Sequence, residues 1–396
     1  MNRPADQSAP RAAGTTLLDV LDNVSPTTTK ADGDRQGQTV LTIGIPKEIA
    51  PGERRVALVP DVVRRLRDAG HEVLVERGAG LRAGAPDDAF ELAGATLGDP
   101  WAADVVAKVA APVAGELSKL RPETILVGFL NPLGDPRGLA KLAATGATAL
   151  AMERIPRISR AQAMDALSSQ ATVSGYRAVL MSALELPRFF PLFMTAAGTV
   201  PPAHVLVVGA GVAGLQAIAT ARRLGALVTA FDVRSAVKDQ VKSLGATFFE
   251  VEGIGDAEGT GGYARELTPE EQSRQRDALA VQMARSDVIV TTALVPGKPA
   301  PTLIPASAVA AMKPGSVIVD LAAEMGGNCE LTKLGETVVT DNGVKVIGPV
   351  NVPSDMPEHA SALYARNILA LIELGFDFDD EVVSGACVVR HGKVVQ

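Results

Sequence analysis

Cysteine and histidine are scarce in this sequence, and their scarcity excludes several kinds of site. The 396 residues include two cysteines, Cys329 and Cys387, which cannot make a disulfide framework and do not have a metal-type spacing. The four histidines are scattered, so we predict no structural zinc site and no other metal site. A reduced, cytoplasmic compartment is the natural setting for such a chain.

Basic clusters and uninterrupted apolar spans are also missing. The formal net charge is −7 and no basic run stands out, which argues against a nucleic-acid-binding surface. Residues 189–221 contain no Asp, Glu, Lys or Arg, as a membrane span would. Three prolines, Pro191, Pro201 and Pro202, interrupt this segment, so we interpret it as the approach to a buried strand and predict no transmembrane helix.

The remaining composition is typical of a large α/β enzyme. Apolar residues make up 47% of the chain and charged residues 21%, and the length is too great for one ordinary core. Residues 1–38 are poor in aromatic residues and rich in Ser, Thr, Asp, Gln and Gly. Because their amino end has no apolar core, we predict a disordered extension rather than a signal peptide.

Residues 204–232 organise the rest of the chain. An apolar run at 205–208 predicts a strand, a G-x-G-x-x-G match follows at 209–214, and a helical pattern spans 215–224. Gly225 ends that helix, and a second strand at 226–231 leads to Asp232. Glycines in this pattern alone could be a structural turn, but the order of strand, turn, helix, strand and acid favours a dinucleotide site.

Each position in this motif has a physical task. Gly209 permits the tight turn, Gly211 lets the backbone approach a pyrophosphate, and Gly214 lets helix and strand pack closely. The N–H groups at the helix start hold phosphates. Asp232 can accept both ribose hydroxyls of NAD(H) and would repel the extra phosphate of NADP(H). The predicted cofactor is therefore NAD, and the predicted binding residues here are Gly209, Ala210, Gly211, Val212, Gly214, Asp232, Val233 and Arg234.

Strands and helices alternate along both halves of the chain, which predicts two doubly wound parallel-sheet, Rossmann-like domains with a cleft between them. A helix at 361–373 is expected to cross back to the first domain, and residues 387–395 to form a β-hairpin turning on Gly392. The predicted domains are 39–167 plus 356–396, without a phosphate turn, and 168–355, which binds NAD(H). The predicted strands are 40–45, 71–76, 105–109, 147–151, 205–208, 226–231, 241–251, 288–292, 317–321 and 346–348. The predicted helices are 61–69, 88–92, 139–144, 215–224, 269–285, 307–312 and 361–373.

Several long motifs resemble a known family. The opening GIPKE and GERRVALVP resemble the shared amino end of alanine dehydrogenases and proton-translocating NAD(P) transhydrogenases. The runs RISRAQAMDALSSQATVSGYRAV, GTGGYARE, TTALVPGKPAP and MKPGSVIVDLAAEMGGNC resemble specifically the transhydrogenase α subunit, and the resemblance covers about residues 40 to 396. It implies an oxidoreductase that transfers hydride between NADH and NADP⁺ on a partner subunit, coupled to proton translocation by membrane subunits.

The resemblance also implies residues around the nicotinamide. Four residues stand where the family carries its Arg-Gln-Asp loop: Arg157, Gln162, Asp165 and Ser168. Asp165 and Ser168 would hydrogen-bond the carboxamide, and Gln162 would reach toward the second nucleotide. Arg157 would supply a fixed charge near ribose or phosphate. On spacing alone, this segment would be a helical N-terminal cap with surface polar residues.

A second group of residues follows from the same resemblance. Residues 259–263 resemble the family's mobile loop that closes over bound NAD(H), with Gly262 supplying hinge freedom and Tyr263 an aromatic lid. The alternative is a surface loop with a half-buried tyrosine. Leu294, just beyond a predicted strand, would approach the adenosine or nicotinamide ribose, as ligands do outside strand carboxyl ends.

Partners and competing functions complete the expectations. Some transhydrogenase α subunits carry membrane helices that are not seen here, so we expect a homodimeric cytoplasmic component that docks on separate membrane subunits at the inner face of the cell membrane. An alanine dehydrogenase is the first alternative, but Asn131 stands where that family has a histidine. Lys108 and Arg55 match its substrate-binding positions, yet could be a solvated lysine and a structural arginine. A non-catalytic NAD sensor is the second alternative.

Overall fold

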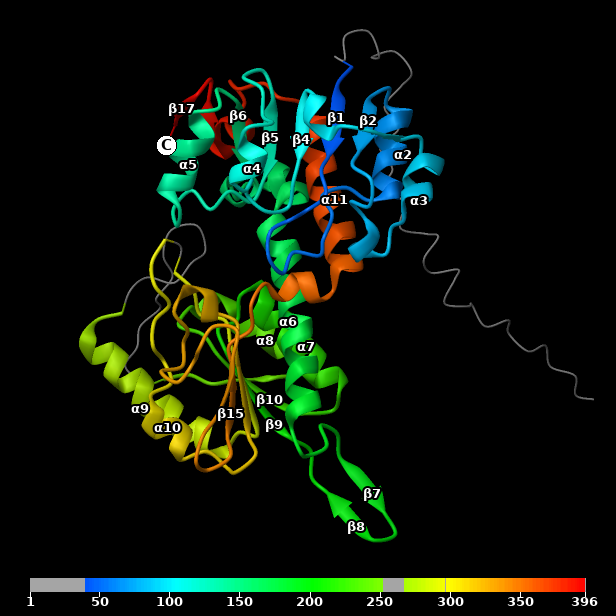
Figure 1. Cartoon of the computed structure of the whole chain (residues 1–396). Helices are drawn as coiled ribbons and strands as arrows, with labels where there is room; N and C mark the ends of the chain where they lie inside the picture. The colour runs from blue at the N-terminus through cyan, green and yellow to red at the C-terminus, as the bar shows by residue number, and fades with distance from the viewer. Residues whose placement is uncertain (1–39, 252–266, 296, 396) are drawn as a thin grey trace, which may run out of the picture. The chain divides into compact units, whose positions relative to one another are not determined.

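The structure, a computed structural model, describes residues 40–251, 267–295 and 297–395. Residues 1–38, predicted to be a disordered extension, and the predicted lid residues Gly262 and Tyr263 lie outside the described residues. The described residues form an eight-stranded sheet, a seven-stranded sheet and a separate two-stranded hairpin. The predicted α/β class with two parallel-dominated sheets is confirmed (Figure 1).

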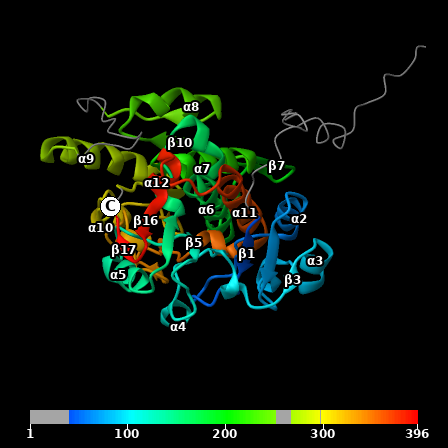
Figure 2. The same cartoon turned by 90° about the horizontal axis from the view of Figure 1, so that it is seen from above.

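The first sheet has the strand order β17-β16-β6-β5-β4-β1-β2-β3, in which β1 to β6 are parallel. Helices α2 and α3 lie beside its β2 and β3 edge (Figures 1 and 2). The chain returns at its end to add β16 antiparallel to β6, followed by β17, and this is the predicted hairpin at Gly392. The strands are β1 Thr42–Ile45, β2 Glu72–Val75, β3 Thr96–Leu97, β4 Val105–Ala107, β5 Ile125–Gly128, β6 Thr148–Ala151, β16 Cys387–Arg390 and β17 Lys393–Val394.

The second sheet has the order β11-β10-β9-β12-β13-β15-β14, with β14 as its antiparallel edge strand. Its parallel part has the same arrangement as the first sheet, since the first strand, β9, lies between the second and the fourth. Ligands of such sheets bind outside the strand carboxyl ends at this point of reversal. The strands are β9 His204–Val208, β10 Leu227–Phe231, β11 Thr247–Phe248, β12 Val288–Thr291, β13 Val317–Asp320, β14 Thr337–Val339 and β15 Lys345–Ile347.

Most helices occur where the apolar spacing predicts them. Helix α9 begins and ends at the predicted residues because Thr268 and Glu271 form a capping box and Pro269 is its first residue. The helices are α2 Pro60–Asp68, α3 Asp87–Leu92, α4 Ala114–Leu117, α5 Pro136–Ala143, α6 Ala166–Glu185, α7 Val212–Arg223, α8 Lys238–Ser243, α9 Pro269–Arg285, α10 Ala306–Ala310, α11 Pro357–Leu374 and α12 Glu381–Ala386. The short 3₁₀ helices are η1 Leu81–Ala83, η2 Pro100–Ala102, η3 Met152–Arg154, η4 Ser159–Met164, η5 Ser235–Val237, η7 Ala323–Met325 and η8 Val352–Asp355.

Two local predictions are wrong. The segment 241–251, predicted as a strand, begins inside helix α8, which buries Val241 and ends before Gly245 at φ 76°, leaving the short β11. The segment before β9 contains an exposed hairpin, β7 Phe193–Thr195 paired with β8 Gly198–Val200. All six of its strand residues are exposed, so this segment is more than an approach to a buried strand. Within the described residues, no helix is both long and apolar enough to cross a membrane.

Helices α6 and α11 join parts of the fold that are distant in sequence. Helix α11 buries Tyr364 and Ile368 in the core of the first sheet, so the predicted crossing back is confirmed. Helix α6 contributes Ala166 to that core and Val179 to a core of the second sheet. One helix is therefore packed into both cores, and its position matters to both.

Candidate functional site

The glycine turn lies at the carboxyl end of β9, where it enters helix α7. Gly209 has φ 98°, and a Cβ there would lie 2.6 Å from the Thr292 hydroxyl oxygen. A Cβ on Gly214 would lie 1.8 Å from the Gly209 carbonyl oxygen, so helix and strand meet without room for a side chain. Gly211 is different, because nothing lies within 4 Å of the position a Cβ would take. The turn is thus closed toward the protein and open where a phosphate would approach.

Asp232 lies at the same turn, directly after β10. Its Oδ2 accepts a hydrogen bond of 2.7 Å from the Ala210 amide, which joins the two ends of the motif. Arg234 donates to both carboxylate oxygens, from Nε to Oδ1 at 2.9 Å and from Nη2 to Oδ2 at 2.7 Å. The neighbouring Val233 packs against buried residues of the second sheet. The sequence pattern pointed to the acid, but it carried no sign of this bidentate partner.

The segment after β12 forms the other wall of the turn. Thr292 donates from its hydroxyl to the Gly209 carbonyl at 3.0 Å, and Leu294 is 43% exposed just beyond it. Asn328 holds this segment, accepting from the Ala293 amide at 3.0 Å and donating to its carbonyl at 2.8 Å. Asn328 is in turn anchored through its own amide to buried Asp320 at 2.7 Å. Sequence reasoning missed Thr292, Asn328 and Asp320, because only their contacts reveal what they support.

The four residues of the Arg-Gln-Asp pattern lie around the start of α6. Asp165 is the N-cap of this helix, accepting from the Ser168 amide at 2.9 Å and from its hydroxyl at 2.6 Å. Both remain half-buried, and each oxygen has lone-pair capacity left for an amide donor. Arg157 and Gln162 are exposed, on the segment that precedes the helix. The capping geometry and a ligand role are therefore compatible in the same residues.

Helix α6 also connects this loop to the glycine turn. A Cβ on Gly175 would lie 2.1 Å from the carbonyl oxygen of Ala213, so α6 crosses the beginning of α7 in direct backbone contact. Figure 1 shows the two helices side by side. The structure therefore brings the Asp165 cap and the glycine turn onto one rigid element, although they are far apart in sequence.

Lys108 and Asn131 depart from an open substrate site. Lys108 is 1% exposed, with its Nζ 3.0 Å from Glu48 Oε2 and 2.9 Å from Glu116 Oε1, so the alternative of a solvated lysine is wrong. Burial raises the pKa of Glu48 against the opposing charge of Lys108. Asn131 has φ 49° and donates its amide to Glu153. Within residues 40–251, 267–295 and 297–395, no cluster of His, Cys, Asp and Glu could hold a metal ion.

Comparison with known proteins identifies the family of this fold and site. A model of the alanine dehydrogenase/PNT N-terminal domain matches residues 44–174, and a model of the alanine dehydrogenase/PNT C-terminal domain matches residues 178–396. The chain belongs to the alanine dehydrogenase/PNT family. The two matches of this family meet inside α6, the helix that contributes to both cores.

Within the alanine dehydrogenase/PNT family, the chain is similar to transhydrogenase α subunits. It is 49% identical over 376 residues to the first portion of the NAD(P) transhydrogenase subunit alpha of Rhodospirillum rubrum, covering 90% of this chain and 98% of the relative. The NAD(P) transhydrogenase subunit alpha of Haemophilus influenzae is 46% identical, with 90% and 72% covered. The transhydrogenase structure from Sinorhizobium meliloti superposes with a TM-score of 0.83 at 44% identity, covering 89% of this chain and all (100%) of that one. An L-alanine dehydrogenase structure gives 0.74 at 27% identity, with 89% and 96% covered.

Proposed function

We propose that this chain is the NAD(H)-binding component of an NAD(P) transhydrogenase. It passes hydride between its own NAD(H) and NADP(H) held by a partner subunit, while membrane subunits translocate protons. The observation that carries the proposal is the open Gly211 beside the Asp232 carboxylate, in a chain 49% identical to an NAD(P) transhydrogenase α subunit.

The glycine turn supports NAD(H) as the cofactor. The amides at the start of α7 point outward where Gly211 leaves space, and they carry the positive end of the helix dipole for the pyrophosphate. The Asp232 carboxylate, held by Ala210, accepts the ribose hydroxyls and repels a 2′-phosphate. Bound nicotinamide supplies the hydride.

The residues of this chain act as positioners, because hydride transfer between two nicotinamides requires no protein acid, base or nucleophile. It requires that the rings be close and correctly oriented, with reacting atoms about 3–3.5 Å apart. Asp165 and Ser168 orient the carboxamide from the rigid start of α6. Exposed Gln162 faces the second nucleotide, and exposed Arg157 places a charge near ribose or phosphate. Leu294 packs on the ribose, and residues 259–263 close over the cofactor.

The exposed hairpin supports a homodimer. Phe189 and Phe193 pair with ring centroids 4.4 Å apart, and Met194 is 76% exposed. Together with Leu192 and Val200 they form a contiguous apolar surface, the hairpin patch, which is unusual on a free protein surface. We propose that a second copy of the chain covers the hairpin patch. In the cell, the cytoplasmic dimer would lie at the inner face of the membrane through its partner subunits.

One experiment separates this function from its alternatives. Purified chain is mixed with increasing amounts of an NADP(H)-bearing partner component, and hydride transfer from NADH to an NADP⁺ analogue is followed. Alone, the chain should bind NADH yet show almost no exchange and no alanine oxidation; the partner should restore exchange with a saturating rate. Rapid exchange by the chain alone would contradict the two-component function. Alanine oxidation would indicate a dehydrogenase, and NADH binding without exchange in the complex would indicate a sensor.

A further inference from the structure

A buried ion pair lies where three distant segments of the chain meet. Arg55 donates from Nε to Glu53 Oε1 at 2.8 Å and from Nη2 to Glu53 Oε2 at 2.7 Å. Their side chains are 8% and 3% exposed. Burial alone would raise the pKa of Glu53, but the hydrogen bonds and charge of Arg55 lower it to about 2. The pair is therefore fully charged at neutral pH.

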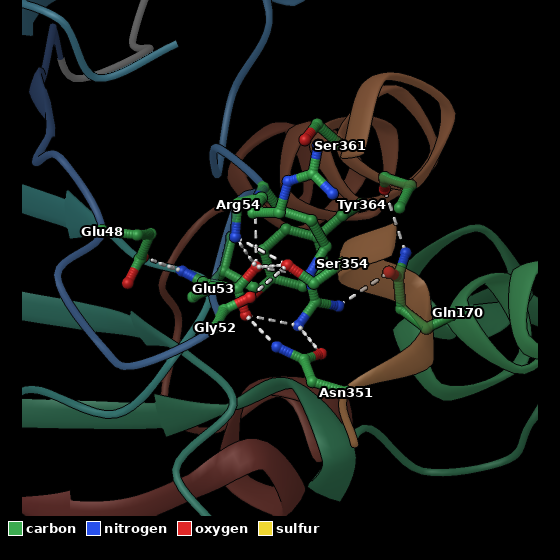
Figure 3. A network of polar contacts seen from close by, with 12 residues as sticks. Glu48, Gly52, Glu53, Arg54, Gln170, Asn351, Ser354, Ser361 and Tyr364 are labelled. Atoms are coloured by element: carbon green, nitrogen blue, oxygen red, sulfur yellow. Dashed lines mark hydrogen bonds and ion pairs between the residues drawn. The ribbon is translucent and has the colours of Figure 1, made fainter. Parts of the chain in front are cut away.

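The remaining hydrogen bonds of the pair reach two other segments. Arg55 donates from Nη1 to Gln170 Oε1 in α6 at 2.8 Å and from Nη2 to Asn351 Oδ1 at 3.2 Å. Asn351 returns a bond from Nδ2 to Glu53 Oε2 at 3.1 Å, and Gln170 donates from Nε2 to the Ala360 carbonyl in α11 at 3.0 Å. Figure 3 shows Glu53, Gln170 and Asn351 converging from these three segments.

Backbone contacts make the junction rigid. Ser354 donates from its hydroxyl to the Gly52 carbonyl at 2.9 Å and accepts from the Arg54 amide at 2.6 Å (Figure 3). Asn351 adopts a left-handed conformation, φ 45° and ψ 51°, which asparagine tolerates better than most residues. The loop at 52–55 is thus attached at several points to the segment that leads into α11.

Gln170 is placed so that this junction can affect the nucleotide site. It lies on α6 between the Asp165 cap and Gly175, whose backbone touches Ala213 in the glycine turn. A helix held at Gln170 cannot slide or rotate without moving both the cap and that contact. Displacements of about 1 Å at a hydride-transfer site are enough to reduce rates about a hundredfold.

We propose that Glu53 and Arg55 are positioning residues for hydride transfer, which act through Gln170 by holding α6 in place. The proposal rests on the proposed transhydrogenase function. Net stability is a poor reason for such a pair, because apolar residues of similar volume usually replace a buried ion pair without loss. An apolar pair would fill the space but could not make the directional bonds to Gln170 and Asn351.

The test compares variants of the full chain assembled with the NADP(H)-bearing partner. Glu53→Gln breaks the pair, and the double variant Glu53→Leu with Arg55→Met replaces it by apolar side chains that favour folding. Asp287→Asn is the matched control, since Asp287 is a buried carboxylate paired with Lys313 at 3.0 Å and lies just before β12, at the amino end of the strand. Thermal unfolding, NADH dissociation constants and single-turnover hydride transfer at saturating NADH and partner are measured for each.

Both Glu53 variants should slow hydride transfer by about tenfold or more, while their NADH affinity changes by no more than about threefold. Asp287→Asn should lower the unfolding temperature but transfer hydride at the wild-type rate. A double variant with both wild-type stability and wild-type rate would overturn the proposal and leave the pair a structural role.

A second measurement keeps the proposal separate from the proposed function. Amide hydrogen exchange of the isolated chain should be faster at residues 165–175 in the double variant than in wild type, and unchanged there in Asp287→Asn. Unchanged exchange in the double variant would overturn the positioning role, whether or not the complex transfers hydride. Absence of transfer by the wild-type complex would instead refute the proposed function alone.

Discussion

Arg234 holds the Asp232 carboxylate in a two-point grip, with distances of 2.9 Å and 2.7 Å, while the Ala210 amide binds the same carboxylate at 2.7 Å. The acid expected to accept the ribose hydroxyls is therefore already engaged, and ribose must share it with or displace the guanidinium. The grip also keeps a phosphate-binding group close to where a 2′-phosphate would lie.

Cofactor preference should depend on this pair. Wild-type chain should bind NADH much more tightly than NADPH, and Asp232→Ala should weaken NADH binding by about tenfold or more, the worth of hydrogen bonds to a charged group. It should also improve NADPH binding, because Arg234 is released. Dissociation constants for both nucleotides measure this, and Arg234→Leu added to Asp232→Ala should cancel the gain. Wild-type constants that are equal, or that favour NADPH, would contradict the role of Asp232.

The two glycines of the turn should fail differently. Gly214→Ala places a Cβ 1.8 Å from the Gly209 carbonyl, so it should lower the free energy of unfolding by at least about 2 kcal/mol. Gly211→Ala meets open space, so the fold should be retained while NADH affinity falls about tenfold, because the methyl group keeps the pyrophosphate away from the amides. Thermal unfolding and NADH titration of both variants separate these effects. Equal losses of stability would show that the open face of Gly211 has no special part.

The loop before α6 should control rate rather than affinity. Gln162→Asn and Asp165→Asn should slow hydride transfer in the complex by about tenfold or more and leave NADH affinity nearly intact. Asparagine caps helices about as well as aspartate, so Asp165→Asn should change stability by less than about 1 kcal/mol. Single-turnover kinetics and NADH titration provide the measurements. If both substitutions abolish NADH binding and turnover merely follows occupancy, these residues bind rather than position.

Acid should weaken the junction at Glu53. The pKa of Glu53 is about 2 in the folded chain against 4.5 for the ordinary side chain, so its contribution is complete above about pH 4.5 and is lost as pH falls toward 2. The expected contribution at neutral pH is about 3 kcal/mol. The difference in unfolding free energy between wild type and Glu53→Gln, measured by denaturant titration from pH 7 downward, should therefore shrink below pH 4.5. A difference that is constant over this range would show that Glu53 keeps an ordinary pKa.

The hairpin patch should determine the oligomeric state. Phe193→Ser with Met194→Ser removes exposed apolar surface from β7, so sedimentation should show a shift from dimer toward monomer. Leu92→Ser, at a residue 83% exposed on α3, is the matched control and should leave the state unchanged. A monomeric wild type, or a dimer that survives the double substitution, would refute this interface.

Local signals in the sequence determined much of this protein. The capping box at Thr268 and the proline after it are enough to start α9, because a cap satisfies amides that no other part of the chain must supply. The glycine motif similarly determines the β9–α7 turn, since its backbone conformation excludes other residues at Gly209 and Gly214. Strand β5, Ile125–Gly128, was missed although its run is apolar, because a buried strand of four residues has no periodicity of its own.

Only the tertiary structure decided which polar groups meet. Lys108 belongs to a strand end in the sequence, and its burial between Glu48 and Glu116 depends on how strands and loops are brought together. Arg55 reaches Gln170 and Asn351 across 115 and 296 positions of chain. Such contacts leave no local pattern, because their free energy arises only when the fold has removed water and aligned donor with acceptor. The sequence alone thus determined the dinucleotide turn, and tertiary packing decided what holds that turn and the Asp165 cap in place.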